Sequence, residues 1–351
     1  MLETRSRSTR QLLPLIAFAL GCSAALPAAG QQILGSGSTF AYPIVTKWSE
    51  AYQQVDHVQI LYQPIGSGRG LTEIKAGVVD FAVSDAPLDS YQLLREGLAQ
   101  FPVIFGGIVP VYNVDGIGTG QLRFTGELLA DIYLGKVTKW NDPAIAAVNP
   151  DVKLPNRAIL VVHRSDGSGT TFNWTDYLSK VSDAWKVRVG VGTNVAWPTG
   201  VGAKDNSGVA EDVARAKGAI GYVEFGYAQR KKVAYGLVRN RAGNFVPPQT
   251  SSFQAATADV DWKRVQDFDV TLSDASSADA YPIMAASFVL IHRYPKDEKR
   301  NREVLAFFRW TLENGQDMAA SLDYLPLSSS LVQEVLSYWK ANWGPSTGSR
   351  M

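Results

Sequence analysis

Residues 59–87 read QILYQPIGSGRGLTEIKAGVVDFAVSDAP, and this stretch decides the fold class. Its apolar segments predict a strand at Gln59–Tyr62, a short helix at Gly70–Ala76 and a second strand at Val79–Val83. The next pattern, Leu88–Gln100, predicts another helix. Short strands that alternate with helices are typical of α/β proteins, in which crossover helices connect parallel strands.

The turn between the first strand and the first helix of this stretch is rich in glycine and carries a hydroxyl. Two further turns have the same composition, and the three are loop 1 (residues 35–40, GSGSTF), loop 2 (residues 65–70, IGSGRG) and loop 3 (residues 166–171, DGSGTT). Loop 1 precedes a helical pattern at Ile44–Tyr52, and loop 3 lies between a predicted strand at Ala158–Val162 and a predicted helix at Phe172–Leu178. Glycines let the backbone approach a ligand, and the first amides of a helix lack partners within the helix. Each loop is therefore a candidate cradle for an anion.

Each loop taken alone is also explained as a helix cap, because Ser and Thr commonly occupy that position. Three such turns favour a ligand, since α/β proteins bind ligands beyond the carboxyl ends of their strands. Loop 2 lacks the spacing of a dinucleotide fingerprint, and Gly135-Lys136 is followed by Val137, where a Walker A loop requires Ser or Thr. The loops therefore favour a small oxyanion.

Charged residues beside the loops refine the choice of ligand. Arg164 precedes loop 3, and Asp166 follows two positions later, so the carboxylate can hold the guanidinium for bidentate contact with a tetrahedral oxyanion. A surface ion pair is the alternative. Asp85 ends a predicted strand, and it either closes a turn or accepts a hydrogen bond from an anion that carries a proton. Phosphate keeps a proton near neutral pH and sulfate does not, so Asp85 favours phosphate.

The chain has 351 residues, 46% of them hydrophobic, and this length favours two compact units over one. The formal net charge is +1, with 34 Lys and Arg against 33 Asp and Glu. No field of positive charge is available to hold a polyanion, so the composition disfavours nucleic-acid binding.

The N-terminus has the pattern of a secretory signal peptide. Three arginines precede the apolar run Leu12–Leu20, and small residues follow to Gly30. We expect residues 1–30 to be the signal peptide of a periplasmic protein. The only cysteine, Cys22, lies within this region, so the exported chain would have no disulfide and no thiolate site. An imperfect lipobox before Cys22 leaves lipid anchoring as the less favoured alternative.

Two β-rich apolar runs, Val103–Tyr112 and Ile283–His292, are candidates for places where the chain passes between two lobes. Lobe 1 would then comprise residues 31–106 plus 285–351, and lobe 2 residues 107–284. Ordinary buried core strands are the alternative, which periodicity does not exclude.

Several motifs resemble those of the phosphate-binding proteins (PstS) of bacterial phosphate ABC transporters. Besides the three loops, they are Val79-Asp80-Phe81, Ser84-Asp85-Ala86-Pro87, Asp131-Ile132-Tyr133-Leu134-Gly135-Lys136, Trp140-Asn141-Asp142, Gly218-Ala219-Ile220-Gly221-Tyr222-Val223-Glu224 and Leu322-Asp323-Tyr324. The resemblance covers essentially all of the chain after residue 30. It implies a two-lobed periplasmic-binding-protein fold of type II, in which each lobe is a mixed, mainly parallel sheet flanked by helices and two strands form the hinge.

The resemblance also implies which residues hold the ligand. Matched motif by motif, the phosphate-binding residues are Thr39, Phe40, Ser67, Asp85, Arg164, Ser168, Gly169 and Thr170, with Asp166 as the partner of the arginine. It implies a monomer without a cofactor, which binds inorganic phosphate or the related arsenate and delivers phosphate to the permease subunits of an inner-membrane ABC transporter. Three positions depart from the family pattern, namely Arg69, His163 and Asp205, and we expect Arg69 to point to solvent.

Two other functions compete with this interpretation. A secreted phosphatase is disfavoured, because the chain has three histidines, His57, His163 and His292, with no cluster of metal ligands and no Gly-x-Ser-x-Gly elbow. We therefore predict that the protein is not an enzyme. A binding protein for a fully ionised oxyanion such as sulfate or molybdate is the second alternative, and Asp85 argues against it.

Overall fold

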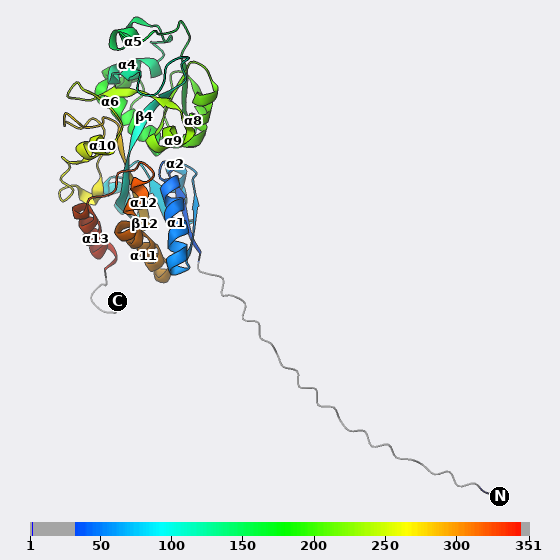
Figure 1. The fold of residues 1–351 in the computed structure, drawn as a ribbon. Helices are drawn as coiled ribbons and strands as arrows, with labels where there is room; N and C mark the ends of the chain where they lie inside the picture. The colour runs from blue at the N-terminus through cyan, green and yellow to red at the C-terminus, as the bar shows by residue number, and fades with distance from the viewer. Residues whose placement is uncertain (1, 3–31, 345–351) are drawn as a thin grey trace. The chain divides into compact units, whose positions relative to one another are not determined.

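The computed structural model describes residue 2 and residues 32–344 of the chain (Figure 1). Except for Leu2, the predicted signal peptide, with Cys22, lies outside the described residues. Between residues 32 and 344, no helix has the length and apolar character needed to cross a membrane.

Short strands alternate with helices along most of the described chain. The strands are β1 (Gln32–Gly37), β2 (Gln59–Gln63), β3 (Phe81–Ser84), β4 (Leu98–Tyr112), β5 (Arg123–Phe124), β6 (Leu160–Arg164), β7 (Val201–Ala203), β8 (Ala219–Glu224), β9 (Ala234–Tyr235), β10 (Leu237–Arg239), β11 (Phe245–Val246) and β12 (Met284–His292). The helices are α1 (Tyr42–Asp56), α2 (Ser67–Lys75), α3 (Ser90–Glu96), α4 (Gly126–Tyr133), α5 (Pro143–Val148), α6 (Gly169–Val181), α7 (Asp183–Arg188), α8 (Asp205–Arg215), α9 (Phe225–Lys231), α10 (Thr250–Thr257), α11 (Glu298–Asn314), α12 (Gln316–Ala320) and α13 (Ser329–Trp343), with a 3₁₀ turn at Gln266–Phe268.

One mixed sheet runs through the described residues in the order β2-β1-β3-β12-β4-β8-β6-β7, with β9 also paired to β4. Strands β1, β2 and β3 are parallel, as are β6, β7 and β8, whereas β12 and β4 run antiparallel to their neighbours. The long strand β4 joins the two groups: residues 98–107 pair with β12, and residues 108–112 pair with β8.

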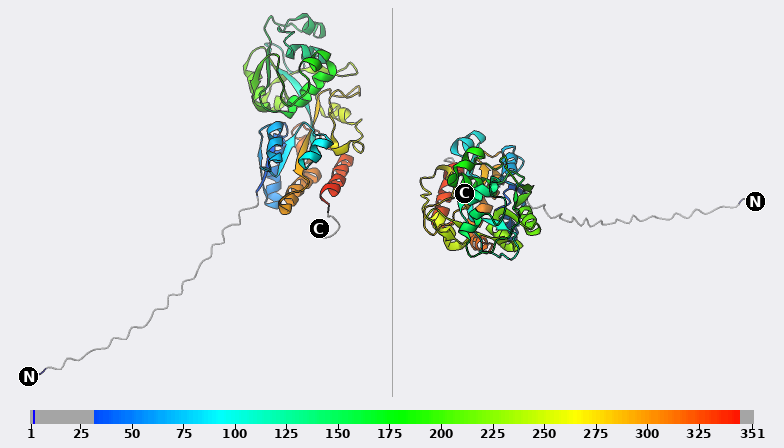
Figure 2. Two further views of the ribbon diagram at one scale, coloured as in Figure 1. Left: turned by 180° about the vertical axis from the view of Figure 1, so that it is seen from behind. Right: turned by 90° about the horizontal axis from the view of Figure 1, so that it is seen from above.

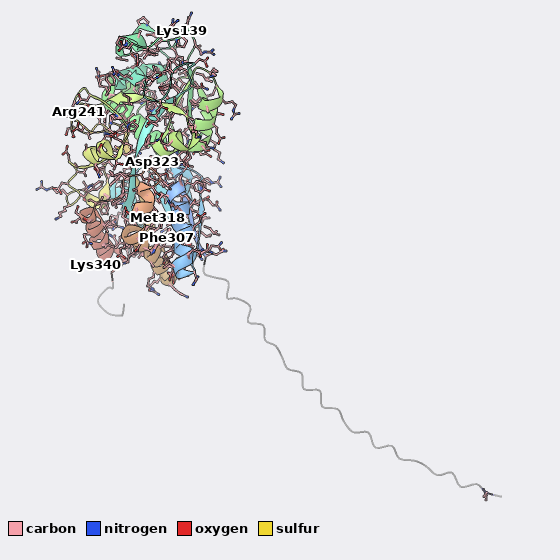
Figure 3. All side chains as sticks on the ribbon, viewed as in Figure 1. Lys139, Arg241, Phe307, Met318, Asp323 and Lys340 are labelled. Carbon is pink, nitrogen blue, oxygen red and sulfur yellow. The ribbon has the colours of Figure 1, made fainter. Side chains whose placement is uncertain are left out.

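The helices follow this division of the sheet. Helices α1, α11 and α13 lie beside the first group of strands, and α4, α6 and α8 lie beside the second, in the front view of Figure 1 and again from behind in Figure 2. Aromatic rings fill the core on both sides of β4. Phe307, labelled in Figure 3, packs 4.9 Å from Phe308, and Trp174 stacks on Tyr222 at the same centroid distance.

The predicted elements correspond well to the observed ones. The strand and helix of residues 59–76 are β2 and α2, and the two apolar runs proposed as crossings are β4 and β12. The helix predicted at Leu88–Gln100 is wrong at its end, because Gly97 adopts a left-handed conformation (φ 64°) that terminates α3. Residues 98–100 therefore begin β4 instead.

Candidate anion-binding site

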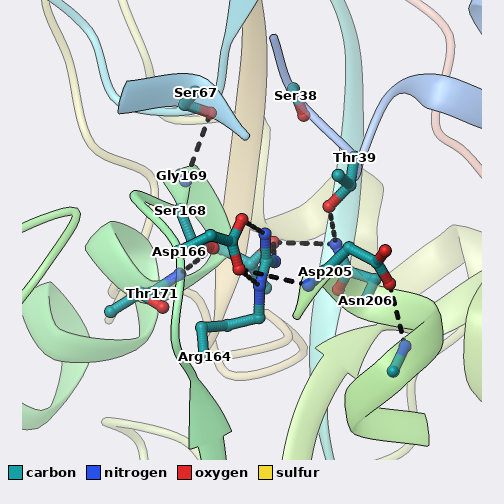
Figure 4. A network of polar contacts seen from close by, with 12 residues as sticks. Ser38, Thr39, Ser67, Arg164, Asp166, Ser168, Gly169, Thr171, Asp205 and Asn206 are labelled. Atoms are coloured by element: carbon teal, nitrogen blue, oxygen red, sulfur yellow. Dashed lines mark hydrogen bonds and ion pairs between the residues drawn. The ribbon is translucent and has the colours of Figure 1, made fainter. Parts of the chain in front are cut away.

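The three Gly-rich loops contact one another at the carboxyl ends of their strands (Figure 4). The N–H of Gly66 donates to the carbonyl of Gly37 at 2.8 Å, which joins loop 2 to loop 1. The N–H of Gly68 donates to the carbonyl of Gly167 at 3.0 Å, which joins loop 2 to loop 3. The parallel strands that precede the loops bring these turns to one edge of the sheet.

Glycine is required where loops 2 and 3 meet. Gly66 has φ 88°, and a Cβ there would lie 2.6 Å from the carbonyl oxygen of Gly167. A Cβ on Gly169 would lie 2.6 Å from Asp85 and from Ser67 Oγ. The backbones therefore approach more closely than side chains allow, as the sequence predicts for these loops.

Asp85 lies at the centre of the site and is only 1% exposed. Ser38 Oγ lies 2.7 Å from both carboxylate oxygens, and Ser287 Oγ donates to Oδ1 at 2.7 Å. Burial raises the pKa of Asp85 to about 6, against the opposing effects of these hydroxyls and of the Arg164 charge. Asp85 is therefore a buried hydrogen-bond acceptor whose negative charge is destabilised by its removal from water.

Arg164 is the buried cation of the site and is 2% exposed. Its Nε and Nη2 donate to the two oxygens of Asp166 at 2.7 and 2.5 Å, which is the bidentate geometry that the spacing predicts. Burial opposes ionisation of Asp166, but the hydrogen bonds and charge of Arg164 lower its pKa below the usual value. Arg164 therefore favours the ionised form of Asp166, and because both side chains of the pair are largely buried, the alternative of a surface ion pair is wrong.

The remaining predicted side chains are small, buried and polar. Thr39, Ser67, Ser168 and Thr170 are each at most 3% exposed. Ser67 Oγ accepts hydrogen bonds from the N–H groups of Asp85 at 3.2 Å and Gly169 at 3.1 Å, so its own hydrogen remains to be donated. Ser168 caps α6 by accepting from Thr171 N–H at 3.0 Å, so capping coexists with its place in the site.

Phe40 differs from the other predicted residues because its side chain points away from the polar groups. Its ring is fully buried against Tyr324, at 6.0 Å between centroids, and against Gly106. The Phe40 carbonyl accepts a hydrogen bond from the Tyr324 hydroxyl at 2.6 Å. The backbone N–H is therefore the group that Phe40 can present to an anion.

The three departures from the family pattern do not disturb this arrangement. Arg69 pairs with Glu73 at 3.3 Å and its side chain is 71% exposed, so the expectation that it points to solvent is confirmed. His163 stacks on Trp197 at 4.7 Å between centroids. The N–H of Asp205 donates to Asp166 Oδ1 at 3.1 Å and so supports the partner of Arg164.

The sequence analysis does not predict a role for Asn206 or Ser287, and it includes Ser38 only as one of the residues of loop 1. Asn206 is fully buried and donates to the hydroxyls of Thr39 and Thr170. Ser287 is the only hydroxyl residue of β12, and a bulge separates it from Phe288. A lone Ser in an apolar strand is a signal that could have identified it, whereas nothing in its local sequence marks Asn206.

The chemistry available at the site is recognition by hydrogen bonding. The hydroxyls of loops 1–3, the amides at the starts of α2 and α6 and the Arg164 guanidinium are donors, and Asp85 is an acceptor. Across residues 32–344, no group of three or more His, Cys, Asp and Glu side chains could hold a metal ion. The arrangement suits a small oxyanion that carries a hydrogen on one oxygen.

Comparison with known proteins supports the same interpretation. Residues 23–314 match the model of the PBP superfamily domain. The phosphate-binding protein PstS of Xylella fastidiosa is 49% identical over 312 residues, which cover 89% of this chain and 86% of that protein. The PstS of Pasteurella multocida is 45% identical, over 93% of this chain and 95% of that protein.

Solved structures share the fold at low sequence identity. A phosphate-binding protein from Stenotrophomonas maltophilia has a TM-score of 0.69 at 17% identity and covers 91% of this chain and 98% of that protein. The periplasmic phosphate-binding protein PfluDING, solved with phosphate bound, has a TM-score of 0.67 at 19% identity over 88% and 93% of the two chains. The predicted mixed α/β two-domain fold of a periplasmic binding protein is thereby confirmed. On the match to the superfamily model and the close relationship to curated relatives, this chain belongs to the PstS family of phosphate-binding proteins.

Proposed function

We propose that the protein captures one inorganic phosphate ion between two lobes and delivers it to the permease of an inner-membrane ABC transporter. The observation that carries the proposal is the burial of Asp85 and Arg164 beside three loops that present hydroxyl and amide donors. The PstS relatives are named as phosphate-binding proteins, and PfluDING was solved with phosphate bound.

The lobes in this proposal are residues 31–106 plus 285–351 and residues 107–284. Strand β4 supports the boundary, because its pairing changes from β12 to β8 after Gly107. Loops 1 and 2 belong to the first lobe and loop 3 to the second, so the bond from Gly169 N–H to Ser67 Oγ crosses between them. This arrangement corresponds to closure of the lobes around the ion, with β4 and β12 as the hinge.

The proposed ligands are Thr39, Phe40, Ser67, Asp85, Arg164, Ser168, Gly169 and Thr170, and Asp166 holds the arginine. Donors from both lobes neutralise the charged oxygens, and Asp85 accepts the hydrogen that phosphate retains. A fully ionised oxyanion offers Asp85 no hydrogen and meets a buried carboxylate instead. This is the physical reason for preferring phosphate over sulfate.

The proposal includes no chemical step, so the protein acts as a carrier and not as an enzyme. It further assigns residues 1–30 as an export signal, the periplasm as the location, and a monomer without a cofactor as the working form. Binding of arsenate is expected, because arsenate has the same shape and protonation pattern as phosphate.

Equilibrium dialysis of the purified protein with labelled phosphate tests the proposal. We expect saturable binding of one ion per chain, competition by arsenate, and no competition by sulfate in large excess. Equal competition by sulfate and phosphate would refute the assignment of the ligand.

A further inference from the structure

Asn206, at the start of α8, is fully buried and makes three side-chain hydrogen bonds, two of them to threonines of the site. Its Nδ2 donates to Thr39 Oγ1 at 2.9 Å and to Thr170 Oγ1 at 3.1 Å, and the first of these bonds is drawn in Figure 4. Its Oδ1 accepts from the backbone N–H of Glu224 at 3.0 Å. None of these contacts involves an exposed group.

The bond from Glu224 decides which way the Asn206 amide faces. A backbone N–H can only donate, so the atom that receives it is the amide oxygen, and the NH₂ group must face the two threonines. Both threonine oxygens therefore accept hydrogen bonds from Asn206.

The bonds from Asn206 limit the direction in which each threonine hydroxyl can point its hydrogen. Thr170 Oγ1 also receives a bond from Arg164 Nη1 at 3.4 Å, so both of its lone pairs are used and only its O–H hydrogen remains. Thr39 Oγ1 has one lone pair occupied in the same way. Without Asn206, either hydroxyl could turn its hydrogen toward another acceptor.

The two threonines also come from different segments of the chain. Thr39 belongs to loop 1 and Thr170 to α6, so one buried amide group holds residues of both proposed lobes. We propose that Asn206 is a positioning residue that makes the Thr39 and Thr170 hydroxyls donors toward the ion and joins them when the lobes close. This inference rests on the proposed function, and it concerns a residue that makes no proposed contact with phosphate.

The first test is Asn206→Ala, with phosphate affinity and the phosphate dissociation rate measured by calorimetry and stopped-flow fluorescence. We expect affinity to fall by about fivefold to about 140-fold, because the change removes donors that two buried oxygens require. Most of this loss should appear as faster dissociation. Asn240→Ala is the matched control, since Asn240 is also buried and its amide donates to the carbonyls of Ala278 and Ala280. The control should lower thermal stability and leave affinity unchanged.

A mutant cycle separates positioning from a general structural role. In a background of Thr39→Val and Thr170→Val, Asn206→Ala should change affinity by less than about twofold, because the hydroxyls through which it acts are gone. An undiminished loss in that background would overturn the inference.

Asn206→Asp provides a second variant if the alanine variant does not fold. Aspartate can keep the bond from Glu224, but it offers the threonines an acceptor, so we expect a larger loss than for alanine. If either variant binds phosphate with the affinity of the unmodified protein, the inference about Asn206 is overturned and the proposed function is not. Absence of phosphate binding by the unmodified protein would instead overturn the proposed function and this inference together.

Discussion

Replacing Gly169 with alanine tests whether the contact between loops 2 and 3 accompanies phosphate binding. The new Cβ would lie 2.6 Å from the Cβ and Oδ2 of Asp85 and 2.6 Å from Ser67 Oγ. These atoms belong to the other proposed lobe, so separation of the lobes relieves the overlap. Overpacking of this kind costs about 1–3 kcal/mol, which corresponds to a loss of affinity of about fivefold to about 140-fold.

The same substitution should leave the free protein stable. Gly169 is the first residue of α6, and alanine is the better helix former, so we expect the thermal midpoint without phosphate to stay the same or rise slightly. Gly208→Ala is the matched control, since Gly208 lies in the first turns of α8 and the nearest atom to its added Cβ is at 3.7 Å. The control should keep full affinity.

Calorimetric titration measures the affinity for phosphate, and thermal unfolding without phosphate measures the stability of the free protein. An affinity for Gly169→Ala within twofold of the unmodified protein would refute the inference that closure brings these loops together. A large fall in the stability of the free protein would show instead that the contact is present without the ion.

Three further predictions concern charged groups. Asp85→Asn should weaken the rejection of sulfate, so that sulfate competes for labelled phosphate in dialysis; unchanged rejection would show that the carboxylate is not the filter. Arg164→Lys should reduce affinity by about tenfold or more in calorimetry, because an ammonium group cannot make the bidentate bond to Asp166 and reach Thr170 as well. Burial raises the pKa of Glu224 from 4.5 to about 8, so the folded protein favours the protonated carboxyl group. The free energy of unfolding is therefore highest below pH 4.5 and falls as the pH rises through 8. The free energy of unfolding of Glu224→Gln relative to the unmodified protein should therefore increase by about 4 kcal/mol between pH 5 and pH 9, and an equal difference in urea denaturation at both pH values would contradict this.

The order of elements was largely predictable, because local patterns determine it. The alternation within residues 59–87 identified β2, α2 and β3, and the apolar runs identified β4 and β12. The end of α3 was missed, because the apolar pattern continues past Gly97 and a backbone conformation, not hydrophobicity, stops the helix.

The residues of the candidate site were also predictable only where they lie close together in the sequence. Loops 1–3 and the Arg164–Asp166 pair lie within short stretches of sequence, so composition and spacing alone identified them. Ser287 and Asn206 reach the site from positions 202 and 36 residues away from their partners Asp85 and Thr170, so only the packed sheet and helices bring them there.

The sequence by itself determined the α/β class, the three Gly-rich turns that open helices and the presence of one carboxylate and one guanidinium beside them, because each of these depends on residues close together in the chain. Only the tertiary structure decided the direction of each hydrogen bond. Burial of Asp85 makes its negative charge unfavourable, so that its pKa rises. Long-range contacts occupy the lone pairs of Ser67 and Thr170. Because these oxygens already accept hydrogen bonds, their hydroxyl hydrogens remain as donors. Which hydroxyls become donors depends on contacts between residues far apart in the sequence, and no local sequence pattern encodes such contacts.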